Sequence, residues 1–194
     1  MLDFSNSKIL IVGDVMLDKY YFGKVDRISP EAPVPIDNIQ KEESRLGGAS
    51  NVANNIVSLG GHSLLCGVIG HDLFGKEIER ISRHKNIDTF LLKTSSPTIT
   101  KARIIGGKQQ IVRVDYEDKS ELNADNKKLF RDTISRILPE YDILVISDYG
   151  KGLISEDLCR YLIKLAHKYD KKVIIDPKGK NWEKYSGADI VTPN

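Results

Sequence analysis

The sequence predicts an α/β protein whose mostly parallel central sheet is accompanied by a small β lid. Short apolar runs rich in β-branched residues alternate with segments of helical periodicity, which is the pattern of strands joined by crossover helices. Two pairs of predicted strands interrupt that alternation without a helix between them, which favours a second, smaller sheet. With 194 residues, of which 40% are hydrophobic, the chain is long enough and apolar enough for one such domain.

The elements of the central sheet follow from the apolar pattern in chain order. Residues 8–12 form a continuous apolar run that ends at a glycine and an aspartate, which is typical of a buried parallel strand. Residues 49–59 carry an apolar face at helical spacing, and Pro139 stops the helix expected over residues 123–138. The other strands are expected at residues 64–69, 143–146, 172–175 and 189–192, and the other helices at residues 73–85 and 155–169.

Four further strands are expected to form the lid. Residues 20–25 and 34–39 follow the first strand directly, without an intervening helical segment. Residues 98–105 and 110–115 flank a pair of glycines, which favours a β-hairpin.

Composition argues against several classes of partner. The net charge is +2, from 29 basic and 27 acidic residues, which is unlike the strongly basic surface of a nucleic-acid-binding protein. No apolar run is long enough to span a bilayer, and residues 1–7 lack the pattern of a signal peptide. The two cysteines have no CxxC partner, which is typical of buried free thiols in a reducing compartment. These observations predict a cytoplasmic protein with no nucleic-acid or membrane partner.

Residues 47–53, Gly-Gly-Ala-Ser-Asn-Val-Ala, carry the clearest binding signal. Two glycines allow a ligand to approach the backbone closely, and the helix start that follows presents free N–H groups. The Asn51 side chain can both donate and accept hydrogen bonds, as a sugar hydroxyl requires. A strand-to-helix turn with an ordinary cap has the same signature when these residues are considered alone.

Carboxylates follow the ends of several predicted strands, where open α/β sheets bind their ligands. Asp14 and Asp18 come after the first strand, and Asp148 comes after residues 143–146. Carboxylates accept hydrogen bonds from sugar hydroxyls, although each one alone is more often a helix cap or a turn residue. The four histidines lack the spacing of metal ligands, so no protein metal site is predicted.

Basic side chains alternate with apolar ones on the predicted lid strands. Lys101, Arg103 and Arg113 are expected to present positive charge on one strand face, and Lys151 and Lys178 follow the ends of central strands. Together these cations could hold a substrate phosphate by charge-assisted hydrogen bonds. A solvated strand face explains the same pattern equally well.

These features together resemble the ribokinase-like (PfkB) carbohydrate kinases. Residues 47–53 are followed by Gly60 after six residues and by Gly70 after nine more, as in the first signature of that family. Within the family, the chain is most similar to the heptose 7-phosphate kinases, which include the kinase domain of the bifunctional heptose kinase and adenylyltransferase. That closer similarity lies in residues 13–20, 27–35, 147–152 and 176–179. The resemblance covers essentially the whole chain.

The resemblance implies a three-layer ribokinase-like sandwich and an enzyme that transfers a phosphoryl group from ATP, with Mg²⁺ bridging the nucleotide phosphates. The acceptor would be the C1 hydroxyl of D-glycero-D-manno-heptose 7-phosphate, and the 1,7-bisphosphate would serve ADP-heptose and lipopolysaccharide core synthesis. Asn194 is expected to contact the nucleotide, and no catalytic residue is assigned within the chain. The residues expected to bind the sugar phosphate are Asp14, Asp18, Gly47, Gly48, Asn51, Arg103, Arg113, Asp148, Lys151 and Lys178.

The resemblance also implies that other parts of such an enzyme lie outside these residues. Relatives continue past the position of Asn194 into an Asn-x-x-Glu motif and a later Gly-Ala-Gly-Asp-type segment, which supplies the catalytic aspartate and the nucleotide site. We therefore expect residues 1–194 to be the N-terminal, sugar-binding part of a kinase domain, inactive alone, with lid strands at about 20–43 and 98–116. Relatives pair their lid strands between subunits, which implies a homodimer.

Two other functions are consistent with the sequence. One is a different ribokinase-like kinase, acting on a fructose phosphate or a ribose-type sugar. The other is a non-catalytic sugar-binding or dimerisation module with the same fold.

Overall fold

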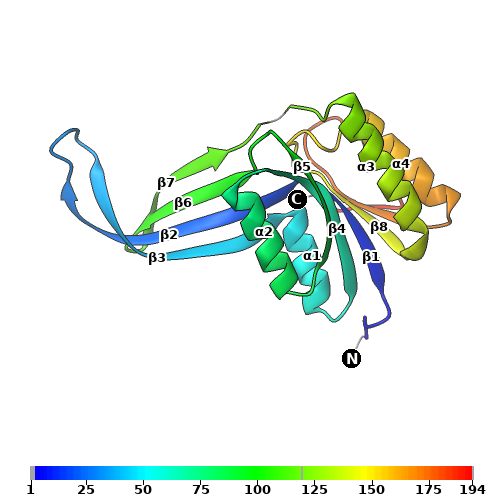
Figure 1. Cartoon of the computed structure of the whole chain (residues 1–194), viewed down its shortest axis with the longest axis horizontal. Helices are drawn as coiled ribbons and strands as arrows, with labels where there is room; N and C mark the ends of the chain where they lie inside the picture. The colour runs from blue at the N-terminus through cyan, green and yellow to red at the C-terminus, as the bar shows by residue number, and fades with distance from the viewer. Residues whose placement is uncertain (1–2, 119, 194) are drawn as a thin grey trace.

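A six-stranded sheet forms the centre of the computed structural model, which describes residues 3–118 and 120–193 (Figure 1). Its strand order is β10-β9-β8-β1-β4-β5, and each strand runs parallel to its neighbours. The strands are β1 (Lys8–Gly13), β4 (His62–Gly70), β5 (Asp88–Thr94), β8 (Ile143–Ser147), β9 (Lys172–Asp176) and β10 (Ile190–Val191). The predicted α/β class with a mostly parallel sheet is confirmed.

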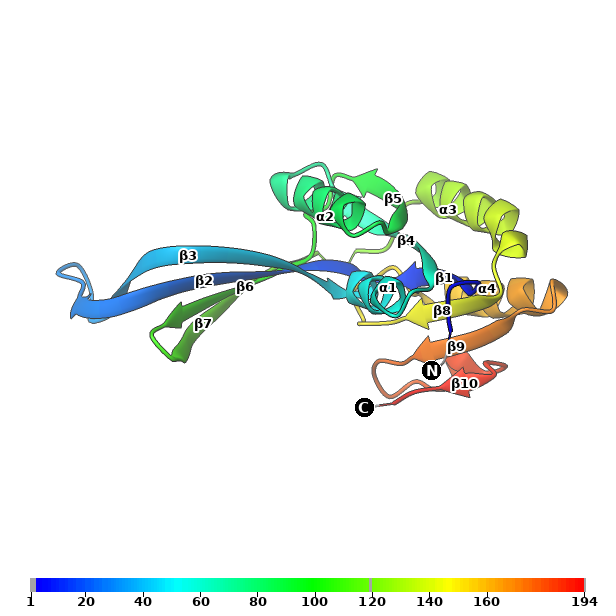
Figure 2. The same cartoon turned by 90° about the horizontal axis from the view of Figure 1, so that it is seen from below.

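Helices cover both faces of this sheet, which gives the three predicted layers (Figure 2). The helices are α1 (Ala49–Ser58), α2 (Leu73–His84), α3 (Ala124–Ile137) and α4 (Glu156–Lys168), with short 3-10 helices at Leu138–Glu140 and Glu183–Tyr185. Side-chain oxygens cap three of them: Asp72 accepts from Gly75 N at α2, Asn123 from Asn126 N at α3, and Ser155 from Leu158 N at α4. Among the described residues, no helix combines the length and the apolar character that crossing a membrane would need.

The alternation of side chains along β1 divides the hydrophobic core in two. Leu10 and Val12 pack into a cluster with residues of α3 and α4, whereas Ile11 packs into a second cluster with residues of α1 and α2. All three side chains are fully buried. A strand covered on both faces has no solvent-facing side, so it appears in the sequence as a continuous apolar run.

The lid is a separate four-stranded sheet that projects from one end of the molecule (Figures 1 and 2). Its order is β3-β2-β6-β7, where β2 pairs antiparallel with β3 and parallel with β6, and β6 pairs antiparallel with β7. The strands are β2 (Val15–Ile28), β3 (Pro35–Gly48), β6 (Thr100–Gly106) and β7 (Gln109–Tyr116). The predicted hairpin is confirmed, with its turn at residues 107–108.

Two differences from the sequence analysis matter for the site. β2 begins at Val15, only one residue after β1, and its first three residues are fully or almost fully buried. The strand expected over residues 20–25 therefore begins five residues earlier, and Asp18 lies on it. Strand β5 was not predicted, because it lies at the sheet edge and its run of apolar residues, 90–92, is short and only partly buried.

Phe130 of α3 provides a test of how the helix is held on the sheet. Its ring is fully buried and lies 5.8 Å, between centroids, from the Phe90 ring of β5. We expect Phe130→Ala to lower the free energy of unfolding by about 3–5 kcal/mol, measured by urea denaturation, because it leaves a cavity. The neighbouring Leu129 is 47% exposed, so Leu129→Ala is the control, with an expected loss of less than about 1 kcal/mol. Equal losses in the two variants would contradict this packing.

Candidate functional site

A cleft of about 620 Å³ lies where the lid meets the beginning of α1. Strands β2, β3 and β6 form one wall, and α1, the end of α2 and Tyr149 contribute the rest. Half of the residues predicted to bind a sugar phosphate line this cleft, namely Asp18, Gly47, Gly48, Asn51 and Arg103. The first part of β2, the glycine segment and strand β6 therefore converge on one cleft.

Strand register explains why charged side chains gather in the cleft. Asp18 on β2 pairs with Arg45 on β3 and with Lys101 on β6. Residues paired directly across neighbouring strands project from the same face of a sheet, as do residues two positions apart. The next pair on this face is Tyr20 with Arg103. These five residues therefore form one charged and aromatic surface over the glycine segment.

An ion pair between Asp18 and Arg103 lies at the centre of this surface. Arg103 Nη1 donates to Asp18 Oδ1 over 2.7 Å, and both side chains are about four-fifths buried. The Arg103 guanidinium also lies 5.1 Å from the centre of the Tyr20 ring, and the Arg45 guanidinium lies 4.9 Å from that same centre. These contacts with the ring add to the ion pairs of the two arginines, because Arg45 Nη2 also donates to Glu43 Oε2 over 2.7 Å.

Positive charge exceeds negative charge in the cleft. Its charged lining residues within the described part of the chain are Asp18, Arg45, Lys85, Lys101 and Arg103. Burial lowers the pKa of Lys101, and the charges of Lys151 and Arg113 lower it further, while Asp18 opposes the change. A cationic surface with one carboxylate fits an anionic ligand that also carries hydroxyl groups.

The beginning of α1 adds uncharged donors to the same cleft. Its N-cap residue, Gly48, makes no side-chain cap hydrogen bond. The Ser50 hydroxyl points inward instead, donating to Gly47 O over 2.6 Å. The first-turn N–H groups therefore lack a side-chain cap, at the end of the helix where the dipole favours a negatively charged group.

Both glycines of this turn are closely packed, Gly48 against the backbone and Gly47 against side chains. Gly48 has φ 56° and ψ −136°, a combination that is essentially restricted to glycine, and a Cβ there would clash with the Asp14 carbonyl oxygen. A Cβ at Gly47 would lie 2.5 Å from Asp18 Oδ2. The glycine pair thus brings the Asp18 carboxylate directly against the backbone that precedes α1.

Asp14 lies behind the cleft rather than in it. Its Oδ2 accepts from the backbone N–H groups of Tyr149 and Lys151, at 2.8 and 3.1 Å. Its backbone carbonyl accepts from Ala49 N over 3.0 Å. The side chain is only 2% exposed, and this burial raises the pKa of its carboxyl group, with the charge of Asp148 adding to the rise. Asp14 therefore positions the cleft and faces a different cavity, which it lines together with Lys151.

The Asp148 carboxylate is engaged by groups of its own chain. It accepts from the Tyr185 hydroxyl and from Gly150 N, both over 2.7 Å, and it forms an ion pair with Lys184. The Tyr185 hydroxyl in turn accepts from the Lys178 backbone N–H over 2.9 Å. This network anchors the segment after β9 to the end of β8 and leaves the Lys178 side chain exposed.

The remaining predicted residues lie apart from the cleft lining. The Lys151 ammonium binds Glu117, and Arg113 forms an exposed ion pair with Asp115 over 2.8 Å. Asn194 lies outside the residues that the structure describes. Among the residues that are described, no group of three histidine, cysteine, aspartate or glutamate side chains could hold a metal ion.

Sequence reasoning missed several lining residues. Tyr20 lies on β2, Arg45 lies on β3 and Lys85 follows the end of α2, and none of the three was assigned to the site from the sequence. One available signal was the spacing of Asp18 and Tyr20, since residues two apart on a strand share a face. The position of Arg45 depends on its register with β2, which the local sequence does not specify.

Comparison with known proteins places this geometry among sugar kinases. The model of the pfkB family of carbohydrate kinases matches residues 6–194. The "Bifunctional protein HldE" of Helicobacter pylori strain P12 is 48% identical over 189 residues, covering 96% of this chain and 41% of that protein. The "D-beta-D-heptose 7-phosphate kinase" of Bordetella bronchiseptica is 44% identical over 191 residues, covering 98% of this chain and 60% of that protein. The chain therefore spans less than two thirds of the length of these relatives.

Solved structures share the fold at lower identity. A possible 1-phosphofructokinase of Thermotoga maritima matches with a TM-score of 0.75 and 21% identity, covering 96% of this chain and 60% of that one. Phosphofructokinase-2 of Escherichia coli matches with a TM-score of 0.72 and 18% identity, with the same coverage. These similarities confirm the ribokinase-like sandwich.

The glycine turn leads to a stability prediction. Gly48→Ala adds a Cβ to a glycine-only conformation against the Asp14 carbonyl, so we expect it to lower the free energy of unfolding by about 2–4 kcal/mol. Gly60 also has a positive φ, of 91°, but a Cβ there meets nothing within 4 Å. Gly60→Ala is therefore the matched control, with an expected loss of about 1 kcal/mol. Chemical denaturation measures the free energy of unfolding of both variants. Equal losses would show that the clash with the Asp14 carbonyl does not cause the loss in Gly48→Ala.

Proposed function

This chain belongs to the pfkB family of carbohydrate kinases, and on that basis we propose that it is the sugar-binding part of a heptose 7-phosphate kinase. The reaction would transfer a phosphoryl group to the C1 hydroxyl of D-glycero-D-manno-heptose 7-phosphate, giving the 1,7-bisphosphate. Support comes from the heptose kinase and HldE relatives at 44–48% identity. We also propose that the product serves ADP-heptose and lipopolysaccharide core synthesis in the cytoplasm.

The observation that carries this proposal is the Asp18–Arg103 pair beside the glycine turn. Asp18 keeps acceptor capacity for sugar hydroxyls, because Arg103 occupies only one of its oxygens in the described contacts. Arg45, Lys101 and Arg103 surround it with cationic donors. A ligand with hydroxyl groups at one end and a phosphate at the other matches this donor set.

Each part of the cleft has a distinct role in the proposal. Asp18 and Asn51 would hold sugar hydroxyls, and the backbone at Gly47 and Gly48 allows the ring to approach α1. Arg103 would orient Asp18, and the Arg103 guanidinium would also face the 7-phosphate. The nearby Lys101 would share that phosphate, whose charge would offset the lowering of the Lys101 pKa.

ATP is the phosphoryl donor that membership of the family implies, and we propose that it acts with Mg²⁺. The cleft itself does not fit that complex, because Asp18, the one carboxylate among its described lining residues, is paired with Arg103. We therefore propose that the nucleotide site and the base that deprotonates the C1 hydroxyl are supplied outside these 194 residues. The greater length of the relatives is consistent with this division.

A homodimer that pairs through the lid completes the proposal. The outer lid carries exposed apolar side chains, including Ile28 at 62%, Val34 at 51% and Val112 at 46% exposure. β3 and β7 are the edges of the lid sheet, and an exposed edge offers unpaired backbone groups to a second strand. Burial of this apolar surface would favour association of two lids.

Binding of the sugar phosphate tests the proposal directly. We expect D-glycero-D-manno-heptose 7-phosphate to bind the protein in isothermal titration calorimetry, and Arg103→Gln to weaken that binding about 10- to 100-fold through loss of charged hydrogen bonds. The control is Arg136→Gln, because Arg136 is exposed at the end of α3, away from the cleft. Tighter binding of fructose 6-phosphate than of the heptose phosphate, or no effect of Arg103→Gln, would contradict the proposed substrate.

A further inference from the structure

Asp72, at the start of α2, attaches the segment that leads into β6 to the core of the protein. This lid linker, residues 95–99, joins β5 to β6. Its Thr98 is 1% exposed, and the Thr98 backbone N–H donates to Asp72 Oδ2 over 2.7 Å. The Thr98 hydroxyl donates to Asp72 Oδ1 over 2.7 Å and accepts from Gly70 N over 2.8 Å. Thr98 is therefore bound by three hydrogen bonds to the end of β4 and the start of α2.

Two glycines beside Asp72 allow the lid linker to pack this closely. A Cβ at Gly70 would lie 2.5 Å from the Ser96 carbonyl oxygen and 2.8 Å from Thr98 N. A Cβ at Gly75 would lie 2.6 Å from the Gly70 carbonyl oxygen. At such separations the neighbouring backbone would have to move. The pattern Gly-x-Asp-x-x-Gly at residues 70–75 is thus explained by the attachment of the lid linker.

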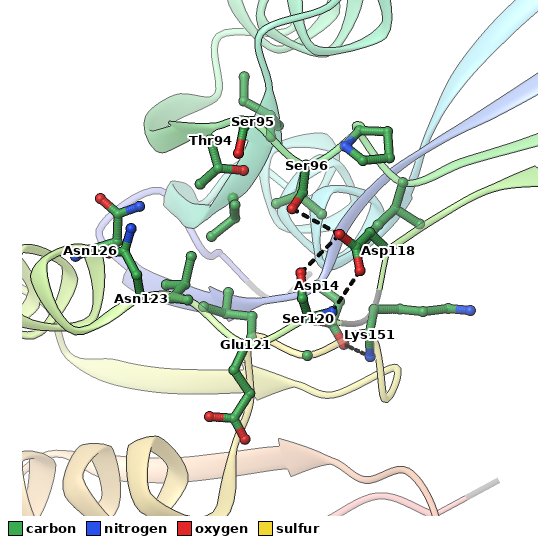
Figure 3. A pocket seen from close by; sticks show the side chains of 18 residues that line it. Asp14, Thr94, Ser95, Ser96, Asp118, Ser120, Glu121, Asn123, Asn126 and Lys151 are labelled. Carbon is green, nitrogen blue, oxygen red and sulfur yellow. Dashed lines mark hydrogen bonds between the residues drawn. The ribbon is translucent and has the colours of Figure 1, made fainter.

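The first turn of α2 also contacts the other end of the β6–β7 hairpin. The Phe74 ring lies 5.4 Å, between centroids, from the ring of Tyr116, the last residue of β7. Tyr116 pairs with Thr100, the first residue of β6. The Ser96 hydroxyl donates to Asp118 Oδ2 over 3.2 Å, which joins the segments that enter and leave the hairpin (Figure 3). Both ends of the hairpin are therefore held beside the start of α2.

The position of the lid cations depends on this attachment. β6 begins two residues after Thr98 and carries Lys101 and Arg103. Asp18, the ion-pair partner of Arg103, lies on β2, which begins directly after Asp14. β2 and β6 thus enter the lid from different points of the core, so the geometry of the Asp18–Arg103 pair depends on where each strand starts. A small displacement of either strand would misplace the groups that receive the ligand.

We propose that Asp72 is a positioning residue for phosphate binding, which acts through Thr98 on the strand that carries Arg103. This role rests on the proposed function, in which the sugar phosphate binds at Arg103 and Lys101. An aspartate suits the role because its two oxygens accept three hydrogen bonds, one from Gly75 N as the α2 cap and two from Thr98. Burial acts to raise the pKa of Asp72, but the hydrogen bonds from Thr98 and Gly75 outweigh it and lower that pKa.

Asp72→Asn separates the attachment of the lid linker from the helix cap. Asparagine caps a helix as well as aspartate does, but its amide nitrogen cannot accept the hydrogen bond from Thr98 N. We expect isothermal titration calorimetry to show about 3- to 10-fold weaker binding of D-glycero-D-manno-heptose 7-phosphate, the effect of one lost hydrogen bond. Thr98→Val should weaken binding similarly, whereas Thr98→Ser keeps the hydroxyl and should bind as the unaltered protein does.

The NMR signal of the Arg103 Nε–H group is a second readout that does not depend on the sugar. It is assigned by its absence from the spectrum of Arg103→Gln. We expect Asp72→Asn and Thr98→Val to shift this signal in the ligand-free protein, because the contact with Asp18 changes. If the unaltered protein does not bind the heptose phosphate, the proposed function fails, and this signal alone decides whether Asp72 positions Arg103.

The control is Ser155→Ala, which removes the side-chain cap of α4 at a residue outside the sugar cleft. We expect it to lower the free energy of unfolding in urea but to leave heptose phosphate binding and the Arg103 signal unchanged. All variants are compared where circular dichroism shows them folded, and Thr98→Val decides if Asp72→Asn does not fold. The proposal is overturned if Asp72→Asn leaves the Arg103 signal unshifted, if it binds the heptose phosphate as tightly as the unaltered protein, or if Ser155→Ala has the same effects.

Discussion

The hydrogen bonds of Asp14 hold together the three segments on which the cleft depends. Its backbone N–H donates to Ser147 O at the end of β8, and its carbonyl accepts from the first residue of α1. Its carboxylate accepts from the N–H groups of Tyr149 and Lys151 in the loop after β8. One residue between β1 and β2 thus fixes the start of a helix, the end of a strand and the loop that follows it. The buried carboxylate thus gives two backbone N–H groups of that loop a hydrogen-bond partner.

The charged residues of the lid are positioned relative to Asp14, because strand β2 of the lid starts at the next residue. β2 begins directly after Asp14, and its first three residues are buried. Asp18, the fourth residue of the strand, is the next one along and lines the cleft. The neighbouring strands then add Arg45 and Lys101 on the same face by register alone. The cleft therefore combines a rigid base, formed by the glycine turn, with a charged wall on a separate sheet. Residues held on strands and on a helix start are positioned more precisely than residues on loops.

Local sequence was sufficient for most of the fold and for half of the site. Central strands such as β1 and β8 are continuous apolar runs, and the glycine segment marks the start of α1, so both follow from local patterns. β5 was missed because an edge strand that is only partly buried lacks that pattern. Asp148 illustrates what local patterns omit: its partner Tyr185 is 37 residues away, and only the folded chain brings the two together. Asp14 was expected among the sugar ligands, whereas the structure turns it toward the protein interior and a second cavity.

The central claim is that the lid face around Asp18 and Arg103 receives a sugar phosphate. A crystal structure of the protein soaked with D-glycero-D-manno-heptose 7-phosphate tests this most directly. The account predicts the phosphate within hydrogen-bond distance of the Arg103 guanidinium or the Lys101 ammonium, and a sugar hydroxyl on Asp18. Density for the phosphate at Lys178, or for the whole ligand in the cavity behind Asp14, would contradict it.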